Sequence, residues 1–429
     1  MPFDGGSGEA RSSSTVGACE ARRDSLERCV TESPAPSARK LALALAPGTL
    51  LAGIAGGIVF PIFPIVGRQV GLSLWFIGLI LAANRAVRVV IAPLVGVITD
   101  RLGGRRTLLF GLVVQIGVAG LYLVGLITHH EGAAFLGGRL LHGVGSACVF
   151  VAAQALALQA GGPSQRGGAA GLVRVTMVLG VPIGFVVGGL LSGPIGHMGV
   201  FIVAGVAITV ASIAAYFTVP DLRAPFSPHP GFAAMIQAMR NRTLLGLGGI
   251  NFVLAFAASG MVLTTLPLLV DGRHLMVFGR NAEGTAGILM GILSMSDAAF
   301  TPFAGAIGDR RNAHAEVAAV SLAISALGLL AMGLADGVVG TAIGIALIGV
   351  GAAGLGPSVL VMMGVIMPAA RRGTGAGILQ LCGDAGGMLG PLVGTTLFAG
   401  STTVPYLATA GLVALFIPVA LRLASSTRS

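Results

Sequence analysis

Six charged side chains fall inside long apolar segments, where ionisable groups are rare. They are Arg85, Arg88, Arg139, Arg174, Asp297 and Asp384. A charge near the centre of a bilayer costs roughly 2.5–3.5 kcal/mol on insertion scales, so such residues persist for a reason. Guanidinium groups suit anion binding, and a carboxyl group in a low dielectric favours its neutral form enough to exchange protons near neutral pH. The pattern therefore indicates ion binding or proton transfer within a membrane.

These residues allow two interpretations. In the functional one, the arginines bind an anionic substrate group or modulate a neighbouring carboxylate, while Asp297 or Asp384 carries a coupling proton. In the structural one, arginine and aspartate only neutralise each other. Arg174 is expected to extend toward the cytosol, and His142 serves as a proton relay or as a hydrogen-bonded packing residue. The predicted substrate or proton pathway comprises Asn84, Arg85, Arg88, Arg139, His142, Asp297, Gln380 and Asp384.

The elements that position these residues are apolar helices. Of 429 residues, 55% are hydrophobic and 10% charged, against about 25% charged in a soluble chain. Runs of about 20 apolar residues can each cross about 30 Å of hydrocarbon. We expect twelve helices, at about 42–66, 73–99, 107–128, 133–160, 168–192, 195–218, 244–270, 285–307, 314–335, 338–367, 373–398 and 402–422. The predicted fold is an all-α membrane protein.

The net charge of +10 is unevenly distributed. Nineteen of the 26 basic residues lie in tails and loops on one side, three lie on the other, and four lie inside helices. This is the positive-inside pattern, so both termini are expected to be cytosolic and nucleic acid is not expected as a partner. Arginine outnumbers lysine 25 to 1, which together with abundant Ala and Gly is typical of a GC-rich bacterial coding sequence. The expected location is the bacterial inner membrane.

The chain contains an internal repeat. Pro93, Gly96, Asp100 and Arg101 recur as Pro302, Gly305, Asp309 and Arg310 at one offset of 209 residues, and the glycines of the fifth helix recur in the eleventh at 206. The repeat predicts two pseudo-symmetric six-helix bundles with a site between them. The expected divisions are a disordered cytosolic arm (1–40), the first bundle (41–219), a cytosolic linker (220–243), the second bundle (244–424) and a short tail (425–429).

Several motifs resemble those of the major facilitator superfamily over roughly residues 41–424. The stretch from Gly96 to Leu108 resembles the loop signature G-x-x-x-D-R-x-G-R-K-x-x-L, with Gly104 where a basic residue is usual. The stretch from Arg139 to Gly145 resembles the helix 4 signature R-x-x-Q-G-x-G, with His142 in place of Gln. The helix 5 antiporter signature, G-x8-G-x3-G-P-x2-G-G, is matched except for Phe185 at its proline.

The resemblance assigns two groups of supporting residues. Conformational gating is expected of Gly96, Asp100, Arg101, Gly103, Arg105, Gly305, Asp309 and Arg310. It also implies that Asp100 faces the start of the eleventh helix in one closed state. Helix packing and bending are expected of Pro61, Pro64, Gly143, Gly145, Gly180, Gly184, Gly390 and Pro391.

These features favour a secondary transporter of a small organic solute that works by alternating access, coupled to protons and directed outward as an antiporter. One alternative is a proton-coupled importer of an anionic metabolite, suggested by the arginines of the first half. An alternative of another class is a transport-inactive membrane sensor or assembly factor. No nucleophile, metal or ATP-binding motif appears, so neither an enzyme nor a cofactor is expected. The expected partners are the solute, protons and the lipid bilayer, and the protein is expected to be monomeric.

Overall fold

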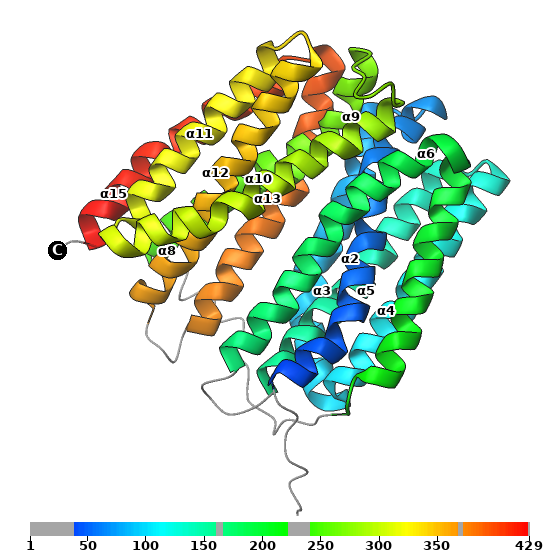
Figure 1. Cartoon of the computed structure of the whole chain (residues 1–429), viewed down its shortest axis with the longest axis horizontal. Coiled ribbons are helices and arrows are strands. Elements are labelled where there is room, and N and C mark those ends of the chain that lie inside the picture. The colour runs from blue at the N-terminus through cyan, green and yellow to red at the C-terminus, as the bar shows by residue number, and fades with distance from the viewer. Residues whose placement is uncertain (1–37, 160–165, 222–240, 368–371, 428–429) are drawn as a thin grey trace, which may run out of the picture.

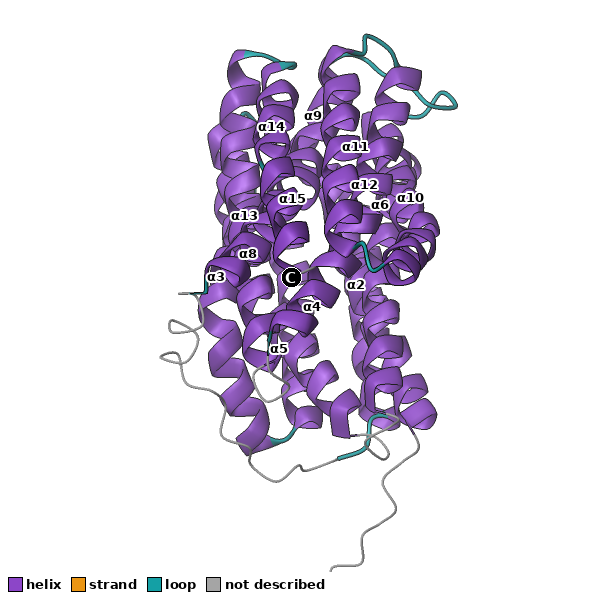
Figure 2. Ribbon diagram, turned by 90° about the vertical axis from the view of Figure 1, so that its left-hand side faces the viewer, coloured by secondary structure: helices purple, strands orange, loops and turns teal. Residues whose placement is uncertain are grey.

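The computed structural model describes residues 38–159, 166–221, 241–367 and 372–427, and none of these forms a strand (Figures 1 and 2). Figure 1 shows the helices of the first half of the chain on one side and those of the second half on the other. The helices are α2 (Ala38–Gln69), α3 (Leu74–Leu102), α4 (Gly104–Thr128), α5 (Glu131–Gln159), α6 (Arg166–Thr218), α8 (Arg242–Leu254), the π-helix η1 (Ala255–Val262), α9 (Leu263–Gly272), α10 (Ala282–Arg311), α11 (His314–Leu334), α12 (Val338–Ile366), α13 (Arg372–Gly400), α14 (Val404–Leu415) and α15 (Ile417–Thr427).

The described helices make twelve crossings. Ten segments are long and apolar enough to span a membrane, and one of them, Leu179–Thr218, runs through a kink. At Gly196 the φ angle is 67°, in the left-handed region that glycine tolerates, so α6 turns back there. Dividing this span and adding α13 brings the number to twelve. The predicted all-α membrane fold of two six-helix bundles is confirmed.

Alternating helix directions define two ends of the molecule. The terminal end holds the start of α2, the α3–α4 connection at Gly103 and the end of α15, and the loop end holds the α4–α5 and α9–α10 connections. Each half has its own hydrophobic core. One core draws its residues from the range 41–219, and the other draws on 244–423 together with Phe185. Rings of Phe63, Tyr122, Phe135 and Phe201 pack together in the first core, where Phe63 stacks on Phe135 and the other pairs meet edge-on or tilted.

Several helix boundaries differ from the sequence-based expectation. Asp100 and Arg101 lie in the last turn of α3 rather than in a loop, because the whole α3–α4 connection is Gly103, whose φ of 91° needs no further residues to turn the chain. The expected arm begins to be helical at Ala38, and α15 continues into the expected tail as far as Thr427. Residues 1–37 and 222–240, which hold most of the arm and the linker, lie outside the described residues.

Glycines let α2 and α6 cross in close contact. A Cβ atom at Gly180 would lie 2.9 Å from the Cα of Gly53, and one at Gly184 would lie 2.8 Å from the Cα of Gly57. The second half repeats the arrangement, since a Cβ at Gly390 would lie 2.6 Å from the Cα of Gly260 in η1. The expected helix at 244–270 is present as the continuous span Arg242–Gly272, and its middle turns widen into the π-helix η1.

Gly184→Val is expected to destabilise the first bundle, because its new side chain would meet the α2 backbone, which cannot rotate away. Overpacking of this kind costs on the order of 1–3 kcal/mol or more. Gly117→Val is the matched control, since a Cβ at Gly117 meets nothing within 4 Å. Thermal unfolding of the purified variants in detergent measures the effect, and equal melting temperatures for the two variants would contradict the packing role.

Candidate functional site

The two halves contact each other at the loop end. On one side α3 packs on α13, where a Cβ at Gly78 would lie 2.8 Å from the carbonyl oxygen of Pro391. On the other side α6 packs on α10, where a Cβ at Gly189 would lie 3.0 Å from the Cα of Gly287. Such close backbone approaches leave no path for a solute between these helix pairs at this end.

The same helices separate toward the terminal end. The α10 side chains Met295, Phe303 and Ile307 are exposed, Met295 to 75%, although α10 is buried in its first turns. On α13, Gly377 and Gln380 are exposed as well. A Cβ at Gly305 of α10 or at Gly377 of α13 would meet nothing within 4 Å, in contrast to the close approaches nearer the loop end, so we interpret the structure as closed at the loop end and open at the terminal end.

An ion-pair cluster (Arg85, Arg88 and Asp384) lies where the opening meets the closed part of the interface. Arg88 of α3 donates through Nε to Asp384 Oδ2 of α13 at 3.2 Å and through Nη2 to Oδ1. Arg85 Nη1 lies 3.5 Å from Oδ1, and Gln380 donates to Oδ2 at 3.1 Å. The Asp384 side chain is 6% exposed, against 21% for Arg85 and 24% for Arg88. The cluster therefore joins the two halves through a buried carboxylate.

Arg139 of α5 lies inside the first half and does not reach Asp384. It is 1% exposed, its guanidinium carbon lies 5.2 Å from the centre of the Phe60 ring, and Nη2 lies 3.5 Å from the carbonyl oxygen of Leu81. No carboxylate is bonded to it among the described residues. Unlike Arg85 and Arg88, Arg139 is thus not part of an ion pair with Asp384.

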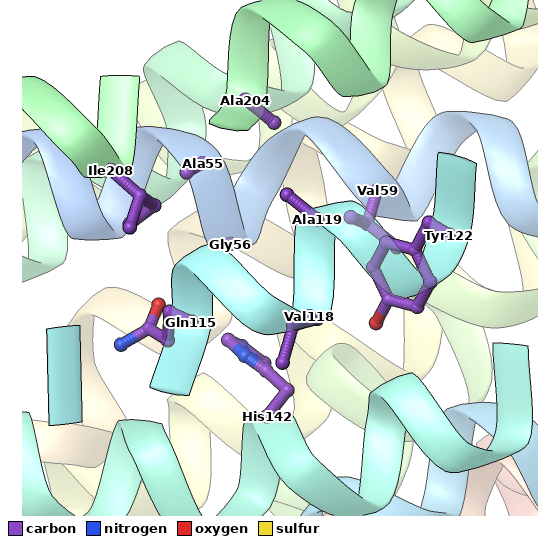
Figure 3. Close-up of a pocket in the computed structure, with 10 residues that line it drawn as sticks. All are labelled: Ala55, Gly56, Val59, Gln115, Val118, Ala119, Tyr122, His142, Ala204 and Ile208. Carbon is purple, nitrogen blue, oxygen red and sulfur yellow. The ribbon is translucent and has the colours of Figure 1, made fainter. Parts of the chain in front are cut away.

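His142 lines a small cavity within the first bundle (Figure 3). The cavity measures about 30 Å³ and is lined by α2, α4, α5 and α6, with Gln115 and Tyr122 as its other polar residues. About 10–15 Å³ is enough for one water molecule, so the cavity can hold two waters but not a solute. Gly143, next along the chain, packs against the backbone of Asn84, which places both in the α3–α5 contact.

Asp297 of α10 stands apart from the ion-pair cluster. Its carboxylate accepts a hydrogen bond from Thr301 at 3.3 Å on its own helix, and among the described residues no ion pair joins it to a cation. The side chain of Arg174 lies outside the described residues. In the structure the two carboxylates differ in their partners, since Asp384 pairs with two arginines and Asp297 bonds a threonine of its own helix.

The predicted gating residues are placed at the terminal end, on α3, α4 and α10. Arg105 donates to the carbonyl oxygen of Tyr216 at 2.6 Å and lies over its ring, so it anchors α4 to the end of α6. In the second half, Asp309 bonds His314 at 3.0 Å. The sequence analysis did not single out His314. This residue is the first of α11 and follows the left-handed Asn312 that ends α10. The gating role of these residues stays a prediction.

A loop-end cluster (Ser192, His197, Asn281 and Glu283) was also missed. His197 Nε2 lies 3.1 Å from Glu283 Oε1, and Asn281 donates to Ser192 Oγ at 3.0 Å, so both bonds join α6 to the start of α10. Arg68 and Asp271 add an exposed pair at 3.5 Å between α2 and α9. One signal was available in the sequence: Asn281 directly precedes the helix α10, and Asn is a preferred N-cap residue. In the structure its side chain accepts a hydrogen bond from the backbone amide of Gly284.

Glu283→Ala is expected to weaken closure of the loop end, because it removes a bond that exists only while the halves touch there. A hydrogen bond to a charged group contributes about 1.5–3 kcal/mol, enough to shift a conformational equilibrium several-fold. A cysteine introduced at the exposed position of Met295, in a background without the four native cysteines Cys19, Cys29, Cys148 and Cys382, should therefore react several-fold more slowly with a thiol reagent.

The matched control is Glu131→Ala, since His129 and Glu131 form a similar pair, at 3.6 Å, within one half at the same end. Glu131→Ala should leave the labelling rate unchanged. An equal decrease in both variants would show that the loop-end cluster does not hold the halves together.

No group of three or more His, Cys, Asp or Glu residues that could hold a metal ion occurs among the described residues. The geometry offers instead a mid-membrane ion pair between two bundles, an opening that leads to it from one end, and bonds that close the other end.

The chain matches known membrane transporters over most of its length. The family model of the Major Facilitator Superfamily matches residues 45–279 and 278–429. A multi-drug resistance efflux pump PmrA homolog of Lactococcus lactis is 24% identical over 82% of this chain and 86% of its own length. The 3-(3-hydroxy-phenyl)propionate transporter of Escherichia coli is 28% identical over 83% and 85%. The solved structure of the nucleoside transporter NupG superposes with a TM-score of 0.74 at 14% identity, covering 89% of this chain and 99% of that one.

Proposed function

Because the chain belongs to the Major Facilitator Superfamily, we propose that it couples the movement of protons to the transport of a small organic solute by alternating access. It is an integral membrane protein and a secondary transporter, not an enzyme. The observation that carries the proposal is the Arg88–Asp384 ion pair, which crosses between the halves where the opening ends.

A proton on Asp384 would change the equilibrium between the conformation that is closed at the loop end and the conformation that is closed at the terminal end. The charged carboxylate attracts two guanidinium groups on the opposite half, whereas the neutral acid does not. Breaking a buried ion pair costs about 3–5 kcal/mol, and moving an equilibrium from 1:99 to 99:1 takes about 5.5 kcal/mol. One proton at this position is therefore sufficient to supply most of the energy that a switch between states requires.

Two directions of transport are candidates. The glycine signature of α6 and the similarity to a drug efflux pump favour outward antiport of a solute. The two arginines of the ion-pair cluster and the similarity to a transporter named for a carboxylate favour import of an anionic metabolite together with a proton. In both cases the loop end faces outward if the positive-inside pattern sets the orientation.

The orientation has a direct test. A cysteine at position 230, in the stretch between the two halves, should be inaccessible to an impermeant thiol reagent in intact cells and should react after the membrane is opened. A cysteine at His130, on the opposite end, should react in intact cells. Reversed labelling would place the termini outside and overturn the orientation.

Proton coupling is tested in proteoliposomes that contain a pH-sensitive dye. We expect that adding some member of a panel of organic anions, cations and neutral compounds moves protons, and that the direction of proton movement gives the direction of coupling. Loss of the signal in Asp384→Asn would support the proposed route. A wild-type protein that moves solutes without protons would refute proton coupling.

A further inference from the structure

Resting on the proposed proton-coupled transport, we infer that the solute is a small organic anion that takes the place of Asp384 on Arg88 and Arg85 when Asp384 is protonated, so that solute and proton bind together.

The first step is the charge of the ion-pair cluster. Two guanidinium groups share one carboxylate, and no second carboxylate is bonded to either of them among the described residues. Arg139 is close enough to act on Arg85 electrostatically and adds a further positive charge. An unpaired charge in a low-dielectric interior is costly, so the cluster favours one more negative group. When Asp384 is protonated it loses its charge, and the cluster then favours a further negative group.

The second step is access. Arg85 and Arg88 keep about a fifth to a quarter of their side chains exposed, whereas Asp384 is nearly covered. Gln380 lies one turn closer to the terminal end on α13 and is exposed. Arg85 rests against Gly387, where a Cβ would lie 2.6 Å from its guanidinium carbon. A solute that enters from the terminal end therefore meets Gln380 and then two guanidinium groups, which bind carboxylates and sulfonates through paired hydrogen bonds.

A cationic solute fits the cluster poorly. It would have to bind Asp384 beside two like charges that already hold this carboxylate, and like-charge contacts in a desolvated site are strongly unfavourable. Asp297 is the remaining mid-membrane carboxylate among the described residues, but it lies on α10, away from α3 and α13. The cluster therefore selects for an acid group.

The third step is linkage. The solute's acid group and ionised Asp384 compete for the same donors, so a proton on Asp384 removes the competitor. By reciprocity, the bound anion favours the protonated carboxyl by the same factor, and such couplings are usually between about 5- and 150-fold. Anion binding should therefore tighten as pH falls. Ligands that bind together cross together, so this arrangement favours symport over antiport.

The groups that face Asp384 limit what else could titrate there. From α3 these are Arg85 and Arg88, and behind them on α5 lie Arg139 and His142, which interact electrostatically with the α3 arginines. The α8 side offers the amide of Asn251, which donates to the carbonyl oxygen of Leu379 at 2.6 Å, and α12 has no titratable side chain between Val338 and Ile366. His142 is the imidazole that lies behind the cluster among the described residues, so His142→Gln is included in the test.

The experiment measures ligand binding to the purified full chain in detergent at pH 5.5 and pH 8. The probes are benzenesulfonate and benzoate, hexanoate as an aliphatic acid, and benzamide and benzamidine as neutral and cationic analogues of benzoate. We expect at least one anion to bind at least 5-fold more tightly at pH 5.5, without binding of benzamide or benzamidine. D384N should bind that anion tightly at both pH values, Arg88→Gln should lose binding, and His142→Gln should keep the pH dependence. Arg280→Gln, at an exposed loop position, controls for nonspecific attraction of anions.

Several outcomes would overturn the inference: binding of benzamidine in place of the acids, no binding of any acid at pH 5.5, or anion binding with the same pH dependence in Asp384→Asn as in the wild type. Proton flux driven by neutral or cationic solutes alone would leave the proposed function standing and reject the anion. Conversely, pH-linked anion binding without any solute-driven proton flux would support the anion site and reject proton-coupled transport.

Discussion

Asp384→Asn is expected to abolish solute accumulation driven by a proton gradient while leaving exchange of solute for solute intact. The amide has nearly the shape of the carboxyl group but cannot release a proton. The ion-pair cluster is therefore held in the state that it has when Asp384 is protonated. Solute can then bind and cross, but its movement no longer carries a proton with it. Accumulation should fall to the level of a protein-free control, and exchange should stay within a few-fold of wild type.

The measurement is uptake into proteoliposomes under two conditions: an imposed pH gradient with empty vesicles, and equal pH with vesicles preloaded with unlabelled solute. Asp336→Asn is the matched control, because Asp336 is an exposed carboxylate between α11 and α12 and lies outside the interface between the halves. It should behave as the wild type in both conditions.

Asp297→Asn separates the two carboxylates. If accumulation survives in Asp384→Asn but is lost in Asp297→Asn, the proton carrier is Asp297 and the ion-pair cluster is structural. The structure favours Asp384 because its two arginine partners lie on the opposite half, so that its charge acts on the contact between halves. Asp297 bonds only a threonine of its own helix among the described residues.

Much of the fold could be predicted because each membrane helix appears in the sequence as a continuous apolar segment. Apolar length alone indicates α3 or α11, and the repeat of Pro93 as Pro302 indicates the duplication. Helix ends were less predictable: charge suggests a loop at Asp100, yet one left-handed glycine completes the turn and the charges remain helical. Whether a short polar stretch is helical or forms a loop depends on backbone dihedral angles, such as the positive φ of Gly103, and composition does not determine these angles.

The site was only partly predictable for a different reason. Asp384 could be singled out because its repeat counterpart is the uncharged Val178, but Arg88 lies 296 residues away in the other half. No local pattern states which helices of two bundles face each other. Arg139 illustrates the limit, since its charge suggests the solute pathway while its contacts with Phe60 and Leu81 place it within the first bundle. The loop-end bond between His197 and Glu283 was missed for the same reason.

Arg88→Met is expected to destabilise the protein more than any other change in the cluster, because it removes the arginine that is hydrogen-bonded to the nearly buried Asp384 and leaves Gln380 as the remaining hydrogen-bond donor. Removing one member of a buried pair costs about 3–5 kcal/mol. The lower part of that range applies here, since Arg85 remains 3.5 Å from the carboxylate and Arg88 itself is partly exposed. Reduced expression in the membrane and a lower melting temperature in detergent should both follow.

Adding Asp384→Asn to Arg88→Met should restore much of that stability, since the double variant no longer buries an unpaired carboxylate. The cycle of two single variants and the double variant measures the interaction itself. Adding Asp384→Asn to Arg139→Met should give no such rescue, because Arg139 is not bonded to this carboxylate. Equal rescue of both arginine variants would mean that Asp384 responds only to the total charge of the bundle, and the cross-half ion pair would then have no special role in holding the two halves together.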